Sequence, residues 1–267
     1  MTSYAEVIGD PIAQSKSPLI HRFWLDRLGI VGDYRACLVP PARLADYLAE
    51  RRDDPDWRGC NVTMPHKLAV MALVDDPGDV RGSIGAMNTV VRQNGGLIGT
   101  NTDAAGFGAP IAGLDLAGRS VAVVGTGGAA RAVLFALARI GVGEVTMIAR
   151  DPSKAAALLD AFGLSGRTAS LAAPVPAAAL LVNASSLGMA GQPPLDLDIG
   201  ALPGDAVVYD VVYSPLETRL LAAARARGLP TVDGLAMLVG QAAVAFELFF
   251  GAAPPREADG ALRALLS

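Results

Sequence analysis

The chain has 267 residues and a net charge of −4, from 22 basic and 26 acidic residues that are mixed along the sequence. This length suits two domains of ordinary size or one large one, and the charge pattern leaves no basic face for nucleic acid and no polybasic patch for a membrane surface. Hydrophobic residues make up 52%, and glycines and prolines punctuate the apolar runs, which excludes a disordered chain and indicates a globular α/β protein.

Membrane, export and metal functions find no support in the composition. The mean hydropathy is +0.39, but no run of about 18 apolar residues is free of charges, glycines and prolines, so we expect no membrane span. The first six residues carry no basic segment before an apolar block, and we therefore expect a cytoplasmic protein. Cys37 and Cys60 are the only cysteines, and without a paired motif or histidines at metal spacing they predict neither a disulfide framework nor a metal site.

Apolar, β-prone runs alternate with helical patterns over the first hundred residues, and this order predicts a mostly parallel sheet covered by helices. The predicted elements are a strand at 4–8, a helix at 17–29, a strand at 34–39, a helix at 41–51 and a strand at 59–63.

A polar cluster follows the last of these strands. Asn61 and Thr63 are two residues apart and share a strand face, and Lys67 lies just beyond a turn stiffened by Pro65. Two uncharged hydrogen-bonding groups and an amine could bind a polar small molecule. For this pattern by itself, a surface loop with a solvated lysine is the commoner interpretation.

The first unit closes after a polar turn at 94–96 and the tripeptide 101–103, before a helix near 104–113. A second series begins with a buried strand at 120–124, which enters the glycine turn of Gly125 and Gly127 and then an apolar helix to Arg139. This strand, turn and helix are typical of a dinucleotide site, in which the backbone approaches a pyrophosphate at the helix N-terminus. The alternative is an ordinary connecting turn, since alanines occupy the third-glycine region.

Further strands at 144–148, 179–183 and 206–212 and helices at 152–162 and 215–227 complete a nucleotide-binding domain. The segment after the second strand bears on the cofactor. Ala149 stands where an acid would bind the NAD ribose, while Arg150 and Lys154 could clamp the 2′-phosphate of NADP. Asp151 would oppose that phosphate unless it only caps the helix that begins at Pro152.

Several motifs in one order give the chain a resemblance that covers nearly its whole length. It resembles the shikimate 5-dehydrogenase family, which reduces 3-dehydroshikimate with NADPH. The motifs are 9–18, 61–67, 85–89, 101–103, 125–129, 183–189, 209–215 and 233–242.

The resemblance implies a binding role for several polar residues. Ser15 and Ser17 would bind the substrate carboxylate with help from Tyr213, although Ser17 before Pro18 also fits a helix N-cap. The ring hydroxyls and carbonyl would be held by Asn61, Thr63, Asn88 and Gln241. For Gln241 considered by itself, an ordinary helix residue is the favoured interpretation.

Lys67 and Asp103 match the catalytic pair of the family. An ammonium beside the carbonyl oxygen stabilises the charge that hydride transfer creates and supplies the proton, and Asp103 would orient Lys67 and bind the neighbouring hydroxyl. A structural Lys–Asp ion pair is the alternative.

The resemblance also implies a cofactor site, with NADP as the cofactor and NAD as the alternative. The chain departs from the usual family pattern at Ala149 and Asp151, and NAD is the alternative for this reason. The cofactor residues would be Gly125, Thr126, Gly127, Gly128, Ala129, Arg150, Lys154, Ser186, Met189, Val211, Gly234 and Met237.

We therefore predict an α/β protein with a substrate-binding catalytic domain at 1–103, a Rossmann-like NADP-binding domain at 104–235, and a C-terminal helical segment at 236–267 that returns to the first domain. The expected activity is the reversible reduction of 3-dehydroshikimate to shikimate in chorismate and aromatic amino acid biosynthesis, by a monomer or homodimer. The alternatives are a dehydrogenase of quinate or aminoshikimate, and a catalytically weak binding relative.

Overall fold

The computed structural model describes residues 2–267 and divides into two compact units. The first unit consists of Met1–Thr102 and Val239–Ser267, and the second of Asp103–Leu238. Within the described range, no helix is both long and apolar enough to cross a bilayer.

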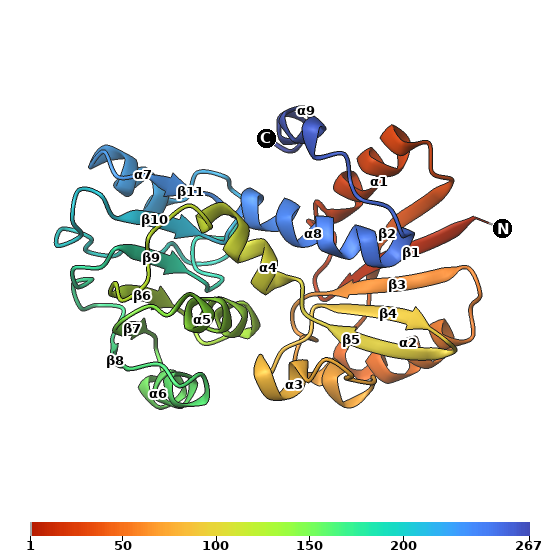
Figure 1. Ribbon diagram of the computed structural model, residues 1–267, viewed down its shortest axis with the longest axis horizontal. Helices are drawn as coiled ribbons and strands as arrows, with labels where there is room; N and C mark the ends of the chain where they lie inside the picture. The colour runs from red at the N-terminus through yellow and green to blue at the C-terminus, as the bar shows by residue number, and fades with distance from the viewer. Residues whose placement is uncertain (1) are drawn as a thin grey trace. The chain divides into compact units, whose positions relative to one another are not determined.

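The sheet of the first unit is mixed, with the strand order β2-β1-β3-β4-β5 (Figure 1). β1 pairs in parallel with β2 and β3, whereas β3, β4 and β5 pair antiparallel. The antiparallel part follows from the turn at Asn94 and Gly95, whose positive φ angles of 52° and 79° suit a two-residue hairpin. The strands are β1 (Ser3–Gly9), β2 (Gly32–Leu38), β3 (Trp57–Val62), β4 (Thr89–Gln93) and β5 (Gly96–Thr100).

Helices cover this sheet, and the expected C-terminal return is confirmed. The later part of α8 packs on the sheet through Ala245 and Phe249, which lie in one core cluster with Ala5, Val7 and Tyr34. The helices are α1 (Ser17–Leu28), α2 (Leu44–Arg52), α3 (Val80–Ser83), α8 (Gly234–Phe250) and α9 (Asp259–Leu266), with short 3-10 turns η1 (Pro41–Arg43), η2 (Ala69–Ala72) and η4 (Arg256–Ala258).

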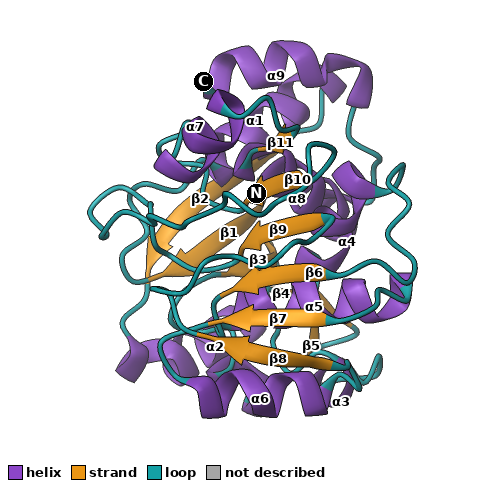
Figure 2. Cartoon of the chain, turned by 90° about the vertical axis from the view of Figure 1, so that its left-hand side faces the viewer, coloured by secondary structure: helices purple, strands orange, loops and turns teal. Residues whose placement is uncertain are grey.

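The second unit has a six-stranded sheet in the order β11-β10-β9-β6-β7-β8, and all its pairings are parallel (Figure 2). Along β6, Val121 and Val123 join one core cluster while Ala122 and Val124 join another, so both faces of the sheet are covered. The elements are β6 (Val121–Val124), β7 (Val145–Ile148), β8 (Gly166–Ala169), β9 (Leu180–Asn183), β10 (Val207–Asp210), β11 (Thr231–Val232), α4 (Asp103–Gly108), η3 (Ala109–Ile111), α5 (Gly128–Ile140), α6 (Pro152–Ala161) and α7 (Arg219–Ala226).

The predicted α/β class is confirmed, and the differences from the predicted elements have local causes. The helix expected from residue 215 begins only at Arg219, because the Thr218 hydroxyl caps it by accepting from the Leu221 N–H at 3.3 Å. The helix expected at 104–113 divides into α4 and η3, with Pro110 in the first turn of η3. The short strands β4, β5, β8 and β11 were not among the predicted elements.

A histidine occupies the aromatic core of the first unit. The His21 ring is wholly buried and stacks on Tyr34 with the ring centroids 3.9 Å apart, and Trp24 and Phe246 surround it. Neither ring nitrogen has a hydrogen-bond partner among residues 2–267. Burial lowers the pKa of His21 from 6.5 to about 3, so the ring is neutral in the folded protein.

This neutral histidine predicts a loss of stability in acid. In the unfolded chain His21 binds a proton below about pH 6.5, whereas in the folded chain it does so only near pH 3. Its contribution to the free energy of unfolding should therefore fall by about 1.4 kcal/mol per pH unit within this window. His21→Phe should remove that slope, so that urea unfolding at pH 7 and pH 4.5 differs by about 2–3 kcal/mol less in the variant than in the wild type. Equal pH slopes in both proteins would contradict the assignment.

Candidate active site

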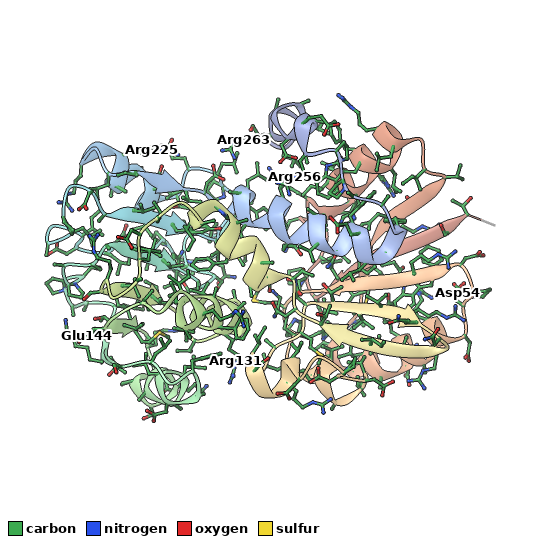
Figure 3. The ribbon with its side chains drawn as sticks, in the orientation of Figure 1. Asp54, Arg131, Glu144, Arg225, Arg256 and Arg263 are labelled. Atoms are coloured by element: carbon green, nitrogen blue, oxygen red, sulfur yellow. The ribbon has the colours of Figure 1, made fainter. Side chains whose placement is uncertain are left out.

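Two loops of the first unit leave the same edge of its sheet. β1 and β3 are parallel and in register at Ile8 and Val62, so both chains turn at their carboxyl ends side by side. The Thr63 N–H donates to the Ile8 carbonyl at 2.9 Å, and the Asp10 N–H donates to the Met64 carbonyl at 3.0 Å. This pairing brings the 10–17 and 63–67 segments to one end of the unit, as the motifs require. Asp54, labelled in Figure 3, precedes β3 and lies at the opposite end.

The serine turn stands directly before α1. Ser15 is half-buried, Ser17 is buried, and the Ser17 N–H donates to the Ser15 hydroxyl at 3.3 Å. The expected N-cap at Ser17 is wrong by one residue, since α1 begins at Ser17 and Lys16 holds the N-cap position without a side-chain cap bond. The Lys16 ammonium instead donates to the Leu266 carbonyl near the end of α9, where the C-terminal dipole favours a cation.

Three predicted carboxamides come together in the interior of the first unit. Asn61, Asn88 and Gln241 are 5%, 2% and 7% exposed. The Asn88 side-chain nitrogen donates to the Gln241 side-chain oxygen at 3.4 Å, although 153 residues separate them. The Gln241 amide therefore belongs to a buried polar cluster, and its role in binding stays a prediction.

Three further residues of this cluster were missed by the sequence analysis as functional candidates. The Tyr34 hydroxyl donates to the Asn61 oxygen at 2.6 Å. Thr89 accepts from the Asn61 nitrogen at 3.0 Å, and Thr102 accepts from the Asn88 nitrogen at 2.9 Å. Thr89 and Thr102 each adjoin a predicted site residue in a quoted motif, which is a usable signal, whereas Tyr34 lies in a strand and carries none.

Lys67 and His66 take different positions in their turn. The His66 side chain is buried, and its Nε2 lies 2.6 Å from the Val39 carbonyl oxygen, which places it in a structural contact. Lys67 is half-buried, and its backbone carbonyl accepts from the Met87 N–H at 2.8 Å. The turn is thus tied to the segment that carries Asn88.

Asp103 and Tyr213 belong to the second unit together with the predicted cofactor residues. Asp103 is buried, is the first residue of α4 and follows Thr102 directly, while Tyr213 is half-buried beyond β10. Within residues 2–267, no group of three His, Cys, Asp or Glu side chains is placed to hold a metal ion.

The glycine turn of the second unit connects β6 to α5 as predicted. Gly125 has a φ of +106°, and a Cβ there would lie 3.0 Å from the Ala184 carbonyl oxygen. Gly127 is the N-cap of α5 with extended backbone, and no side chain caps the helix. The half-buried Thr126, Gly128 and Ala129 complete the turn. The first N–H groups of this 13-residue helix thus lack a side-chain cap, as the predicted binding of a pyrophosphate there requires.

The segment after β7 shows how Asp151 is used. Its carboxylate accepts from the Ser153 and Lys154 N–H groups, both at 3.1 Å, so Asp151 is the N-cap of α6. Arg150 and Lys154 are exposed, and Ala149 is buried. The role of Asp151 as a helix cap, which was one of the two considered, is therefore present in the structure. The basic residues Arg150 and Lys154 lie on either side of it in the sequence.

A buried carboxylate organises the predicted nicotinamide loops. Asp210 accepts from Asn183 at 2.8 Å, from the Val212 N–H at 3.0 Å and from the Thr218 hydroxyl at 2.7 Å. Burial raises the pKa of Asp210, and these hydrogen bonds oppose the shift only in part. Asn183 in turn accepts from the Ser185 N–H and hydroxyl at 3.1 and 2.7 Å, which fixes the start of the 183–189 loop.

The predicted residues around these loops differ in exposure. Ser186 and Met189 are half-buried in the 183–189 loop, and the Val211 N–H donates to the Asn183 carbonyl at 3.0 Å. A Cβ at Gly234 would lie 2.3 Å from the Val211 carbonyl oxygen, so only glycine fits there. Met237 is 6% exposed and packs in the core of the second unit.

A glycine turn on a parallel sheet in one unit, together with a buried amide cluster and a serine turn in the other, defines a dinucleotide-dependent oxidoreductase of two α/β units. Residues 7–90 match the model of the shikimate dehydrogenase substrate binding domain, and residues 234–259 match that of the shikimate 5'-dehydrogenase C-terminal domain. The chain is 71% identical to the shikimate dehydrogenase (NADP(+)) of Sphingopyxis alaskensis over 98% of this chain and 96% of that protein. The chain belongs to the shikimate dehydrogenase family.

Solved structures agree with this assignment. Shikimate 5-dehydrogenase from Thermus thermophilus, in complex with NADP(H) and shikimate, is 38% identical with a TM-score of 0.86, covering 99% of this chain and 100% of that one. Quinate dehydrogenase from Corynebacterium glutamicum, in complex with NAD, is 33% identical with a TM-score of 0.86, covering 99% of each chain. The predicted family and the oxidoreductase class are confirmed.

Two glycines of the turn, Gly125 and Gly127, offer a matched test of its geometry. Gly125→Ala should lower the free energy of unfolding by about 2 kcal/mol, because it forces a left-handed residue against the Ala184 carbonyl. At Gly127 a Cβ meets no atom within 4 Å, so Gly127→Ala should stay within about 0.5 kcal/mol of the wild type. Urea unfolding of both variants checks this, and equal losses would show that the turn is not constrained as described.

Proposed function

We propose that this chain is an NADP-dependent shikimate dehydrogenase that reversibly reduces 3-dehydroshikimate to shikimate in the biosynthesis of aromatic amino acids. The observation that carries the proposal is its 71% identity, over 98% of its length, to a protein named shikimate dehydrogenase (NADP(+)). The buried amides of the first unit and the glycine turn of the second support it, because a polyol acid needs many uncharged hydrogen bonds and a dinucleotide needs a helix N-terminus.

In this proposal the cyclic acid is bound by polar residues of the family motifs. Ser15 and Ser17 donate hydrogen bonds to the carboxylate beside the start of α1, and Tyr213 adds a third donor. Hydroxyl and carbonyl groups of the ring are oriented by uncharged side chains, which distinguish donors from acceptors. These side chains are Asn61, Thr63, Asn88 and Gln241.

Lys67 is the proposed proton donor. NADPH, when bound, supplies a hydride to the keto carbon of the substrate. The Lys67 ammonium stabilises the negative charge that develops on the carbonyl oxygen and donates its proton there, and in the oxidation direction the neutral amine accepts the proton of the hydroxyl. Asp103 accepts a hydrogen bond from the neighbouring hydroxyl and so fixes the ring for the reaction.

The second unit is the proposed NADP-binding domain. Backbone N–H groups from Gly125 to Ala129 bind the pyrophosphate, and Arg150 and Lys154 bind the 2′-phosphate. The nicotinamide ring is framed by Ser186, Met189, Val211, Gly234 and Met237.

A quinate dehydrogenase that uses NAD is the second candidate. Asp151 beside the phosphate clamp favours it, and so does the 33% identity to the quinate dehydrogenase from Corynebacterium glutamicum in complex with NAD. Initial rates with shikimate, quinate and aminoshikimate, each with NADP and NAD, separate the two. We expect the highest kcat/KM for shikimate with NADP. If no combination of acid and cofactor were turned over, the chain would be a binding protein and not a dehydrogenase. A cytoplasmic location and a monomeric or homodimeric state stay predictions.

Removal of the Lys67 amine tests the proposed mechanism. Lys67→Ala should lower kcat about 10³-fold, since a positioned acid or base contributes roughly 10²–10⁴-fold. The dissociation constant for shikimate, measured by calorimetry, should change only a few-fold, because the ring and carboxylate contacts remain. A kcat within tenfold of the wild type would exclude Lys67 as the proton donor.

Substitutions after β7 test the choice of cofactor. Asp151→Thr keeps a capping hydroxyl and removes a negative charge 3.9 Å from the Lys154 ammonium, so the kcat/KM ratio of NADP to NAD should rise about 3–10-fold. Arg150→Ala should lower that ratio by about tenfold or more, as one charged hydrogen bond is lost.

Arg167→Ala is the matched control for these substitutions. Arg167 is an exposed arginine of the same unit that pairs with Glu144 at 2.8 Å at the opposite end of β7. Glu144 is labelled in Figure 3. Removal of the Arg167 side chain should leave the kcat/KM ratio of NADP to NAD unchanged. A ratio that Arg150→Ala also leaves unchanged would contradict the binding of the 2′-phosphate by Arg150 and Lys154.

A further inference from the structure

The amide cluster of the first unit is a continuous chain of hydrogen bonds. It starts at the Tyr34 hydroxyl on β2, which donates to Asn61 Oδ1 at 2.6 Å. Asn61 Nδ2 donates to Thr89 Oγ1 at 3.0 Å, and Thr89 Oγ1 donates to Asn88 Oδ1 at 3.2 Å. Asn88 Nδ2 reaches Gln241 Oε1 on α8 at 3.4 Å. Tyr34 and Thr89 are both 0% exposed, so neither can touch a ligand.

Two backbone groups give this chain a direction. The Asn88 carbonyl oxygen lies 3.4 Å from Asn61 Nδ2 and can only accept, so the Asn61 amide must present its nitrogen there. The Thr102 N–H lies 2.7 Å from Asn88 Oδ1 and can only donate, so the Asn88 amide must present its oxygen. A flipped amide would oppose two acceptors or two donors. Tyr34 must therefore donate to Asn61, and Thr89 must accept from it.

The Tyr34 hydroxyl is held rigidly for this role. Its ring stacks on His21 at 3.9 Å with 8° between the planes, and Phe249 packs beside it. Burial, the largest cause, raises the pKa of Tyr34 well above 10, so the hydroxyl keeps the proton that it donates. The Asn61 amide is thus fixed from both sides by buried groups.

We propose that Tyr34 and Thr89 are positioning residues for substrate recognition, which hold the Asn61 amide in one orientation so that its oxygen accepts a hydrogen bond from a ring hydroxyl. A carboxamide oxygen has two acceptor positions, and Tyr34 takes one of them. The remaining position suits a hydroxyl donor and rejects a carbonyl oxygen. The inference rests on the function proposed above, and it adds the polarity of one substrate contact and the two residues that set it.

Two nearly isosteric variants test the inference, because each deletes one hydroxyl of the chain. Tyr34→Phe and Thr89→Val should each raise the KM and the calorimetric dissociation constant for shikimate about tenfold, since one polar contact is worth about that factor. The KM for NADP should stay within twofold. Thr89→Ser, which keeps the hydroxyl, should restore shikimate binding to near the wild-type value.

Tyr47→Phe is the control for a buried tyrosine hydroxyl with no place in the chain. Tyr47 donates to Glu6 at 2.6 Å in the same unit. This variant should lose thermal stability comparably to Tyr34→Phe but keep the wild-type KM for shikimate. The effect of Tyr34→Phe should also disappear in an Asn61→Ala background, because there is then no amide left to orient.

The outcomes separate this inference from the proposed function. Normal wild-type turnover of shikimate, with unchanged shikimate affinity in Tyr34→Phe and Thr89→Val, would overturn the positioning role alone. An effect of Tyr34→Phe that persists in full without the Asn61 amide would also overturn it. A wild-type protein that neither turns over nor binds shikimate would overturn both.

Discussion

The arrangement of the first unit depends on satisfying three buried carboxamides. An unpaired buried amide costs about 1–3 kcal/mol, and Asn61, Asn88 and Gln241 lie where water cannot reach most of their surface. Each finds partners on a different element, so the hydrogen bonds tie β3, β4 and α8 together at one end of the unit. The position of Gln241 on α8 is thereby set by polar contacts at one end and by the packing of Phe249 and its neighbours at the other.

Uncharged groups suit this interior for a second reason, besides the free-energy cost of burying polar groups. A buried charge would require a partner charge or several converging hydrogen-bond donors, and a pair of ions attracts without much regard to direction. An amide has distinct donor and acceptor ends, and the backbone at Asn88 and Thr102 decides which end faces which neighbour. The second unit instead contains a buried carboxylate, that of Asp210, on which three uncharged hydrogen-bond donors converge. That carboxylate holds loops, whereas the amides keep a fixed direction of donor and acceptor.

The sequence predicted the order of the helices and the dinucleotide unit well, because apolar periodicity and the glycine turn are local signals. It did not predict β8 and β11, since runs as short as Thr231–Val232 become strands only by pairing with a neighbour. In the candidate site, motif order pointed to Asn61, Asn88 and Gln241, whose binding roles stay predictions, but no local pattern identifies Tyr34. The hydrogen bond of Tyr34 to Asn61 depends on the pairing of β2 and β3 with β1, which joins residues 27 positions apart.

In both units the loops that carry the motifs follow parallel strands. This arrangement explains why motifs that are distant in the sequence can be recognised as parts of one site. Parallel neighbours end at the same edge, so residues that follow them meet there although they are distant in sequence. Ile8 and Val62 are in register in the first unit, as are Val124, Asn183 and Asp210 in the second. A polar residue at the carboxyl end of such a strand is thus brought to its partners by the backbone before any side chain interacts. The side-chain hydrogen bonds then need only to hold the orientation that the backbone groups at Asn88 and Thr102 select, as the bond between Asn61 and Thr89 does.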